Sequence, residues 1–100
     1  MKRGTTPTHI YTLPLEANTL SSVSITYRQA GGTILTKKGE DLSMKGNTIR
    51  VKLTQEETLS FSCAQPVEIQ VRALTAGGDA LASKIMRVSV ERCLDGEVLA

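Results

Sequence analysis

Apolar and polar residues alternate along most of this chain, and this pattern predicts β-strands. In residues 23–28, Val23, Ile25 and Tyr27 share one face of an extended segment, and serine, threonine and arginine occupy the other. The same alternation runs through residues 8–13, 48–54 and 66–74. Each segment has one apolar and one polar face, which is typical of antiparallel sheets with one side in water.

Turn signals separate these segments. The strings QAGGT at residues 29–33, KGNT at 45–48 and AGGD at 76–79 contain glycine or asparagine, which accept the positive φ of tight hairpins. Strands divided at this spacing predict one all-β domain over residues 1–100, an antiparallel β-sandwich of about six to eight strands. Val51 and Ile69 are expected deep in its core.

Two segments break the alternation. In LTQEETLSF, Thr54 is followed three residues later by Glu57, which fits a capping box and predicts one helical turn. In LASKIMRVSV, Leu81 and Ile85 share one phase and Met86 the other. One extra residue in a strand switches its faces, so we expect a β-bulge near Ile85 and Met86.

The two ends of the chain differ in character. Residues 1–7 contain little that could hold them to a core and are expected to form a flexible N-terminal arm. The C-terminal tail, residues 91–100, carries three apolar side chains, Leu94, Val98 and Leu99. Fold-back over a sheet edge is the favoured arrangement for these side chains, and docking onto a neighbouring subunit is the alternative.

Composition narrows the function classes. The formal net charge is +2 and the aromatic residues are only two tyrosines and one phenylalanine, which argues against nucleic-acid partners. No segment resembles a membrane span or a signal peptide, so the thiols of Cys63 and Cys93 are expected to stay reduced and unbridged. Cys63 is expected on the apolar side of a short strand.

Catalytic and cofactor signatures are missing. His9 is the sole histidine and lies in a strand pattern, which favours a structural or surface role. The glycine pairs are not followed by helices and therefore predict turns, not phosphate loops. The cysteines do not have metal-ligand spacing. We therefore expect no enzymatic activity, no metal and no cofactor.

Three residues beside the first predicted hairpin remain as ligand-contact candidates. Tyr27, Arg28 and Lys37 place one aromatic ring and two cations near one loop. Because sugar sites commonly stack a ring on an aromatic side chain, these residues support an alternative hypothesis, a carbohydrate- or cell-surface-binding β-sandwich module.

Four strings cover nearly the whole chain: RGTTPTHIYTLPL, SITYRQAGGTILTKKGED, GNTIRVKLTQEETLSF and VEIQVRALTAGGDALASKIMRVSV. Together they resemble small uncharacterised prophage-encoded proteins of Gram-positive bacteria, the combination of RGTTPTH with LTQEETL being the most specific element. The hairpin around residues 67–83 is also similar to the immunoglobulin-like N-terminal domain of phage baseplate upper proteins.

The resemblance implies an immunoglobulin-like fold and a non-enzymatic structural or adaptor role in assembly of the virion tail or baseplate. The implied partners are other virion or phage-encoded proteins, or a second copy of the chain, without nucleic acid or membrane. The implied location is the bacterial cytoplasm during assembly and then the virion.

Overall fold

The computed structural model describes residues 1–30, 32 and 34–100, and its main elements are eight β-strands with one short α-helix and two 3-10 turns among those residues. The strands are β1 (Thr8–Thr12), β2 (Leu20–Arg28), β3 (Ile34–Lys38), β4 (Leu42–Lys45), β5 (Thr48–Lys52), β6 (Val67–Thr75), β7 (Ala80–Ala82) and β8 (Met86–Val88). The helical elements are η1 (Ala17–Thr19), η2 (Gly39–Asp41) and α1 (Gln55–Leu59).

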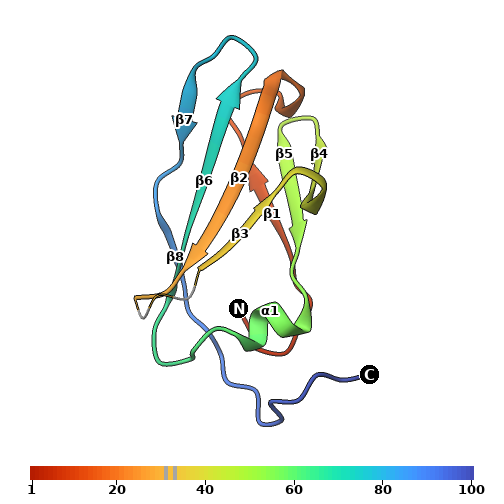
Figure 1. The fold of residues 1–100 in the computed structure, drawn as a ribbon, viewed down its shortest axis with the longest axis vertical. Coiled ribbons are helices and arrows are strands. Elements are labelled where there is room, and N and C mark those ends of the chain that lie inside the picture. The colour runs from red at the N-terminus through yellow and green to blue at the C-terminus, as the bar shows by residue number, and fades with distance from the viewer. Residues whose placement is uncertain (31, 33) are drawn as a thin grey trace.

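The strands form two antiparallel sheets packed face to face, so the predicted β-sandwich is confirmed (Figure 1). One sheet has the strand order β1-β5-β4, and the other has the order β3-β2-β6, with β7 and β8 pairing to successive parts of β6. The predicted turns at 45–48 and 76–79 join β4 to β5 and β6 to β7. The predicted turn at 29–33 includes Gly31 and Thr33, which lie outside the described residues.

The core lies between the sheets and is built from the alternating apolar positions. Val51 and Ile69 are 1% and 3% exposed, which confirms their predicted burial. Each large apolar side chain removed from water contributes about 2 kcal/mol before chain entropy is subtracted. The one-sided patterning of the strands is therefore sufficient to hold the two layers together.

The helical turn forms where the capping box predicts it. The Glu57 N–H donates to the Thr54 hydroxyl (3.1 Å), and the Thr54 N–H donates to the Glu57 carboxylate (2.8 Å). The same carboxylate forms an ion pair with the Lys37 ammonium at 2.6 Å. Partial burial raises the pKa of Glu57, but the bonds to Lys37 and Thr54 outweigh it and hold that pKa below its usual value.

The prediction that Cys63 lies on the apolar side of a strand is wrong. Residues 60–66 form a turn, and Cys63 is exposed in it. The buried side chain of Gln29 holds this turn, because its amide donates to the carbonyls of Ser62 (2.7 Å) and Gln65 (2.9 Å). Hydrogen bonds to Gln29, the residue directly after β2, therefore hold this segment in place of strand pairing. Both Cys63 and Cys93 carry free thiols.

The expected flexible arm at residues 1–7 is replaced by an ordered segment that joins the two sheets. The Arg3 N–H donates to the Glu91 carbonyl (3.1 Å), and the Glu91 N–H donates to the Met1 carbonyl (2.8 Å). Leu53 then bonds to the Pro7 carbonyl at 3.0 Å, in the other sheet. The flexible arm was expected because residues 2–6 contain no apolar side chain, whereas backbone hydrogen bonds and the Met1 side chain, which packs against the core, hold the segment.

Candidate binding groove

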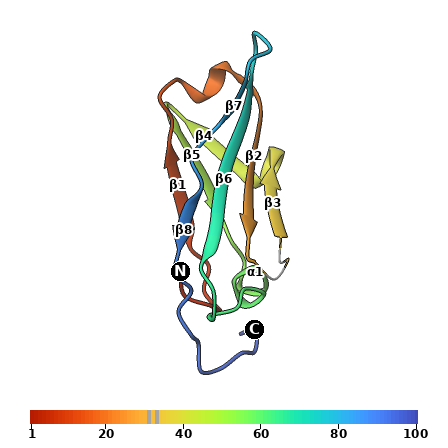
Figure 2. The ribbon, with the colours of Figure 1, turned by 90° about the vertical axis from the view of Figure 1, so that its left-hand side faces the viewer.

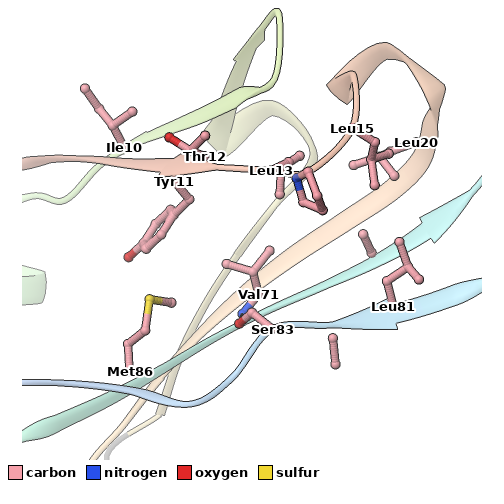
Figure 3. Close-up of a pocket in the computed structure, with 13 residues that line it drawn as sticks. Ile10, Tyr11, Thr12, Leu13, Leu15, Leu20, Val71, Leu81, Ser83 and Met86 are labelled. Carbon is pink, nitrogen blue, oxygen red and sulfur yellow. The ribbon is translucent and has the colours of Figure 1, made fainter.

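An apolar groove of about 500 Å³ opens on one side of the sandwich, between β1 of the small sheet and β7 and β8 of the large one (Figure 3). Figure 2 shows the sandwich from the side on which β7 and β8 lie. Most of its lining side chains are aliphatic. The lining residues are Ile10, Tyr11, Thr12, Leu13, Pro14, Leu15, Leu20, Val71, Ala73, Leu81, Ala82, Ser83 and Met86. Because this groove combines a large volume with a predominantly apolar lining, we treat it as the candidate site.

Strand alternation places the lining side chains. In Figure 3, Tyr11 and Leu13 point from β1 into the groove, while Ile10 and Thr12 point away from it. Leu81, at the lip opposite β1, is 41% exposed. Apolar side chains that remain half in water at a concave surface favour contact with an apolar partner.

A β-bulge keeps the floor of the groove apolar. Arg72 pairs with Ala82 and Ile69 pairs with Met86, so two residues of β6 face the three residues 83–85. This confirms the predicted extra residue and places it just before Met86. The face switch turns both Leu81 and Met86 toward the groove.

Ser83 repairs the ladder at the bulge. Its N–H donates to the Val71 carbonyl (2.8 Å), and its hydroxyl accepts from the Val71 N–H (3.0 Å). The side chain thus satisfies a peptide group that the bulge would leave unpaired. The groove floor is consequently an ordered surface.

A hydrogen-bonded chain of three side chains lies beside the groove. The Tyr27 hydroxyl is 2.8 Å from His9 Nδ1 and 3.0 Å from the Tyr11 hydroxyl. The Tyr27 hydroxyl has one proton, so it donates one of these hydrogen bonds and accepts the other. It therefore either accepts from His9 and donates to Tyr11, or accepts from Tyr11 and donates to His9. The chain links β1 of one sheet to β2 of the other.

The environment of this chain favours uncharged side chains. Burial, and secondarily the positive charge of the N-terminus, lower the pKa of His9. Burial raises the pKa of Tyr11 and, more strongly, that of Tyr27. All three groups are therefore held neutral near pH 7, which suits a structural link between two sheets.

The structure does not bring the predicted ligand-contact residues together. Tyr27 is fully buried, so a ligand cannot reach the ring, and this expectation is wrong because Tyr27 belongs to the inward phase of β2. Lys37 is also buried, paired with Glu57. Arg28 is exposed at the end of β2, on the outer face of the large sheet.

The C-terminal tail runs below α1 (Figure 1) and leaves its apolar side chains in water. Leu94, Val98 and Leu99 are 95%, 47% and 70% exposed. Two hydrogen bonds hold the tail: the Leu99 N–H donates to Gln55 Oε1 (2.8 Å), and the Gln55 amide donates to the Leu99 carbonyl (3.1 Å). The favoured expectation, that these side chains cover a sheet edge, is therefore not what the structure shows.

The sequence analysis missed the groove because no single segment carries it. Its residues come from β1, the following loop, the start of β2, and the segment from β6 to β8, more than forty residues later. One signal was present in the sequence. β1 and β7, with the segments THIYT and ALA, contain no aspartate, glutamate, lysine or arginine, whereas β3 contains Lys37 and Lys38 and β4 contains Lys45.

Across residues 1–30, 32 and 34–100, the structure contains no group of three or more histidine, cysteine or acidic side chains placed to hold a metal ion. None of the helices in that described part is both long and apolar enough to cross a membrane. Comparison of the chain with models of known protein families, with curated proteins and with solved structures gives no match.

Proposed function

We propose that this protein is a non-enzymatic structural or adaptor module that acts by protein–protein contact, with the groove between β1 and β7 as its contact site. The observation that carries the proposal is an apolar groove of about 500 Å³ bordered by two uncharged edge strands. An extended segment of a partner can add to such an edge through its backbone while its alternate side chains enter the groove.

The charge on the other edges supports this choice of site. Lysines on edge strands deter pairing with other chains, and they occur on β3 and β4, at the other edges of the two sheets. β1 and β7 lack this protection, whereas β8, further along the same side, carries Arg87 paired with Glu68. A protein that binds partners through one side of its sandwich needs this asymmetry.

The proposed setting is assembly of a phage tail or baseplate, in the bacterial cytoplasm and then in the virion. The support for this setting is the sequence resemblance to prophage-encoded and baseplate proteins. The carbohydrate-binding alternative loses its main support, because the ring of Tyr27 on which it relied is fully buried.

A matched pair of substitutions tests the contact site. Leu81 lies at the groove and Leu74 lies on the outer face of β6, and both are 41% exposed. Leu81→Asp and Leu74→Asp therefore add the same charge at equally exposed positions, one inside the site and one outside it. Folding of both variants is checked by circular dichroism.

The readout is incorporation into particles made by a strain whose induced prophage encodes the chain and from which the native gene has been deleted. We expect immunodetection to find the wild type and Leu74→Asp in purified particles and Leu81→Asp to be depleted from them. Absence of the wild-type chain from the particles would refute the virion role. Equal incorporation of all three forms would refute the groove as the contact site.

A further inference from the structure

The free edge of β1 identifies a partner for the proposed contact site, and this inference rests on the proposed function. At each end of β1, one backbone hydrogen bond extends the ladder between β1 and β5. The Leu13 N–H donates to the Asn47 carbonyl (2.7 Å), and the Pro7 carbonyl accepts from the Leu53 N–H (3.0 Å). These two bonds fix the phase of the ladder along the whole strand.

In an antiparallel ladder, residues that exchange hydrogen bonds alternate with residues that do not. The odd-numbered residues between 7 and 13 therefore bond to β5. The even-numbered residues Thr8, Ile10 and Thr12 direct their N–H and C=O groups away from β5, along the open side of the sandwich. β1 is thus an ordered template with three unpaired residues facing outward.

The sequence of β1 is symmetric about its centre. Thr-His-Ile-Tyr-Thr reads as threonine, ring, isoleucine, ring, threonine in both directions. If two copies of β1 pair antiparallel about Ile10, the outward groups fall in register, with Thr8 opposite Thr12 and Ile10 opposite its counterpart. The intervening His9 and Tyr11 also fall opposite each other, as a cross-strand pair of rings.

We propose that the partner at this edge is a second copy of the chain, with β1 pairing to β1 across a two-fold axis at Ile10. A two-fold contact requires a surface that is complementary to itself, and the palindromic pattern of β1 meets that requirement. The two small sheets then form one continuous sheet with the order β4-β5-β1-β1-β5-β4, where the second half belongs to the second copy.

The contact has no electrostatic obstacle and covers exposed apolar surface. β1 carries no charged residue, and Ile10, 53% exposed in the single chain, packs against its counterpart. The nearest cation on the outer face is Arg50, which is paired with Ile10 in the ladder. The two Arg50 side chains would lie about three strand spacings apart, roughly 14 Å, beyond the screening length at physiological salt.

Sedimentation velocity of the full chain over a concentration series tests the proposal. We expect wild-type protein to form dimers with a dissociation constant in the micromolar range. Ile10→Lys places two ammonium groups opposite each other and should weaken the dimer by at least about tenfold. Thr36→Lys is the matched control, because Thr36 is the central, exposed residue of edge strand β3, and it should leave the dimer unchanged.

Amide hydrogen exchange supplies a second readout that does not depend on the charge substitution. In concentrated wild-type protein, the amides of Thr8, Ile10 and Thr12 should be protected, and dilution should remove that protection. A wild-type chain that stays monomeric at millimolar concentration overturns the proposal. So does a dimer that persists in Ile10→Lys, or one that Thr36→Lys disrupts equally.

A truncation lacking residues 94–100 separates this contact from docking of the C-terminal tail. We expect the truncated chain to dimerise normally. If the truncation abolishes the dimer and Ile10→Lys does not, the tail is the occupant of the contact and the β1 pairing is wrong. These results are independent of the particle assay, so a monomer that still enters particles would refute the second copy alone and leave the proposed function standing.

Discussion

Replacing Tyr27 by phenylalanine should lower the stability of the sandwich by removing one buried hydroxyl. This hydroxyl bonds to His9 Nδ1 at 2.8 Å and to the Tyr11 hydroxyl at 3.0 Å. Phenylalanine keeps the ring and its packing against Phe61, whose ring centroid lies 6.3 Å from that of Tyr27. The substitution therefore isolates the hydrogen bonds from the apolar contacts.

The expected loss is about 2 kcal/mol, because two hydrogen bonds are removed and each contributes roughly 1 kcal/mol net. A deeper loss is not expected, since His9 and Tyr11 are only half-buried and water can reach part of each side chain. For a domain of this size, the melting temperature should fall by about 10 °C. Urea denaturation, fitted as a two-state transition, measures the free energy of unfolding directly.

Tyr11→Phe is the matched control, since it removes one of the two bonds and should cost about half as much. The double variant should cost less than the sum of the two single changes, because both remove the same bond. If Tyr27→Phe changes the free energy of unfolding by less than about 0.5 kcal/mol, the chain of side chains does not hold the sheets together. Strict additivity would contradict the shared bond.

Three further outcomes follow from the structure. Burial lowers the pKa of His9 below 6.5 in the folded protein, so as the pH falls His9 of the unfolded chain is protonated at a higher pH than His9 of the folded chain. The contribution of His9 to stability is therefore complete above pH 6.5 and declines as the pH falls below it. His9→Gln should flatten that decline, measured by urea denaturation at a series of pH values. Gln29→Ala should destabilise by about 3 kcal/mol in the same assay, because it removes three hydrogen bonds, each contributing roughly 1 kcal/mol, from a side chain only 2% exposed. Removal of residues 94–100 should change stability by less than about 1 kcal/mol, because the tail's apolar side chains are already in water, and a larger loss in thermal unfolding would show that they cover the core.

The fold was predictable because local patterns carry it. Alternation fixed the inward face of each strand, so the burial of Val51 and Ile69 could be read from the sequence. The spacing of Thr54 and Glu57 located α1, because both halves of a capping box lie within one turn. These features depend only on residues close together in the chain.

The candidate site was not predictable in the same way, because it depends on which strands become neighbours. Tyr27 was correctly placed on an apolar face, but the depth of that face depends on packing by the opposite sheet. Cys63 was misplaced because Gln29, more than thirty residues earlier, determines the path of its turn. Long-range backbone pairing also orders residues 1–3, and no alternating pattern in that segment indicates it.

The open side of the sandwich is divided into a sealed half and a free half. Residues 1–3 pair with the segment after β8 and seal one half, where the N-terminal ammonium also bonds to the Ser89 carbonyl at 2.7 Å. The groove occupies the other half, between β1 and β7. The chain itself therefore covers one half of this opening and leaves the other half, at the groove, uncovered.

The free half is also anchored. His9 and Tyr11, on the inward face of β1, bond to Tyr27 in the opposite sheet, so β1 is tied across the sandwich as well as along its ladder to β5. An added strand gains free energy only if its template is already ordered, because otherwise binding must also offset the entropy of ordering the edge. The polar chain beside the groove therefore supports the proposed contact site indirectly, because it holds β1 in place while leaving the outward peptide groups of β1 unpaired.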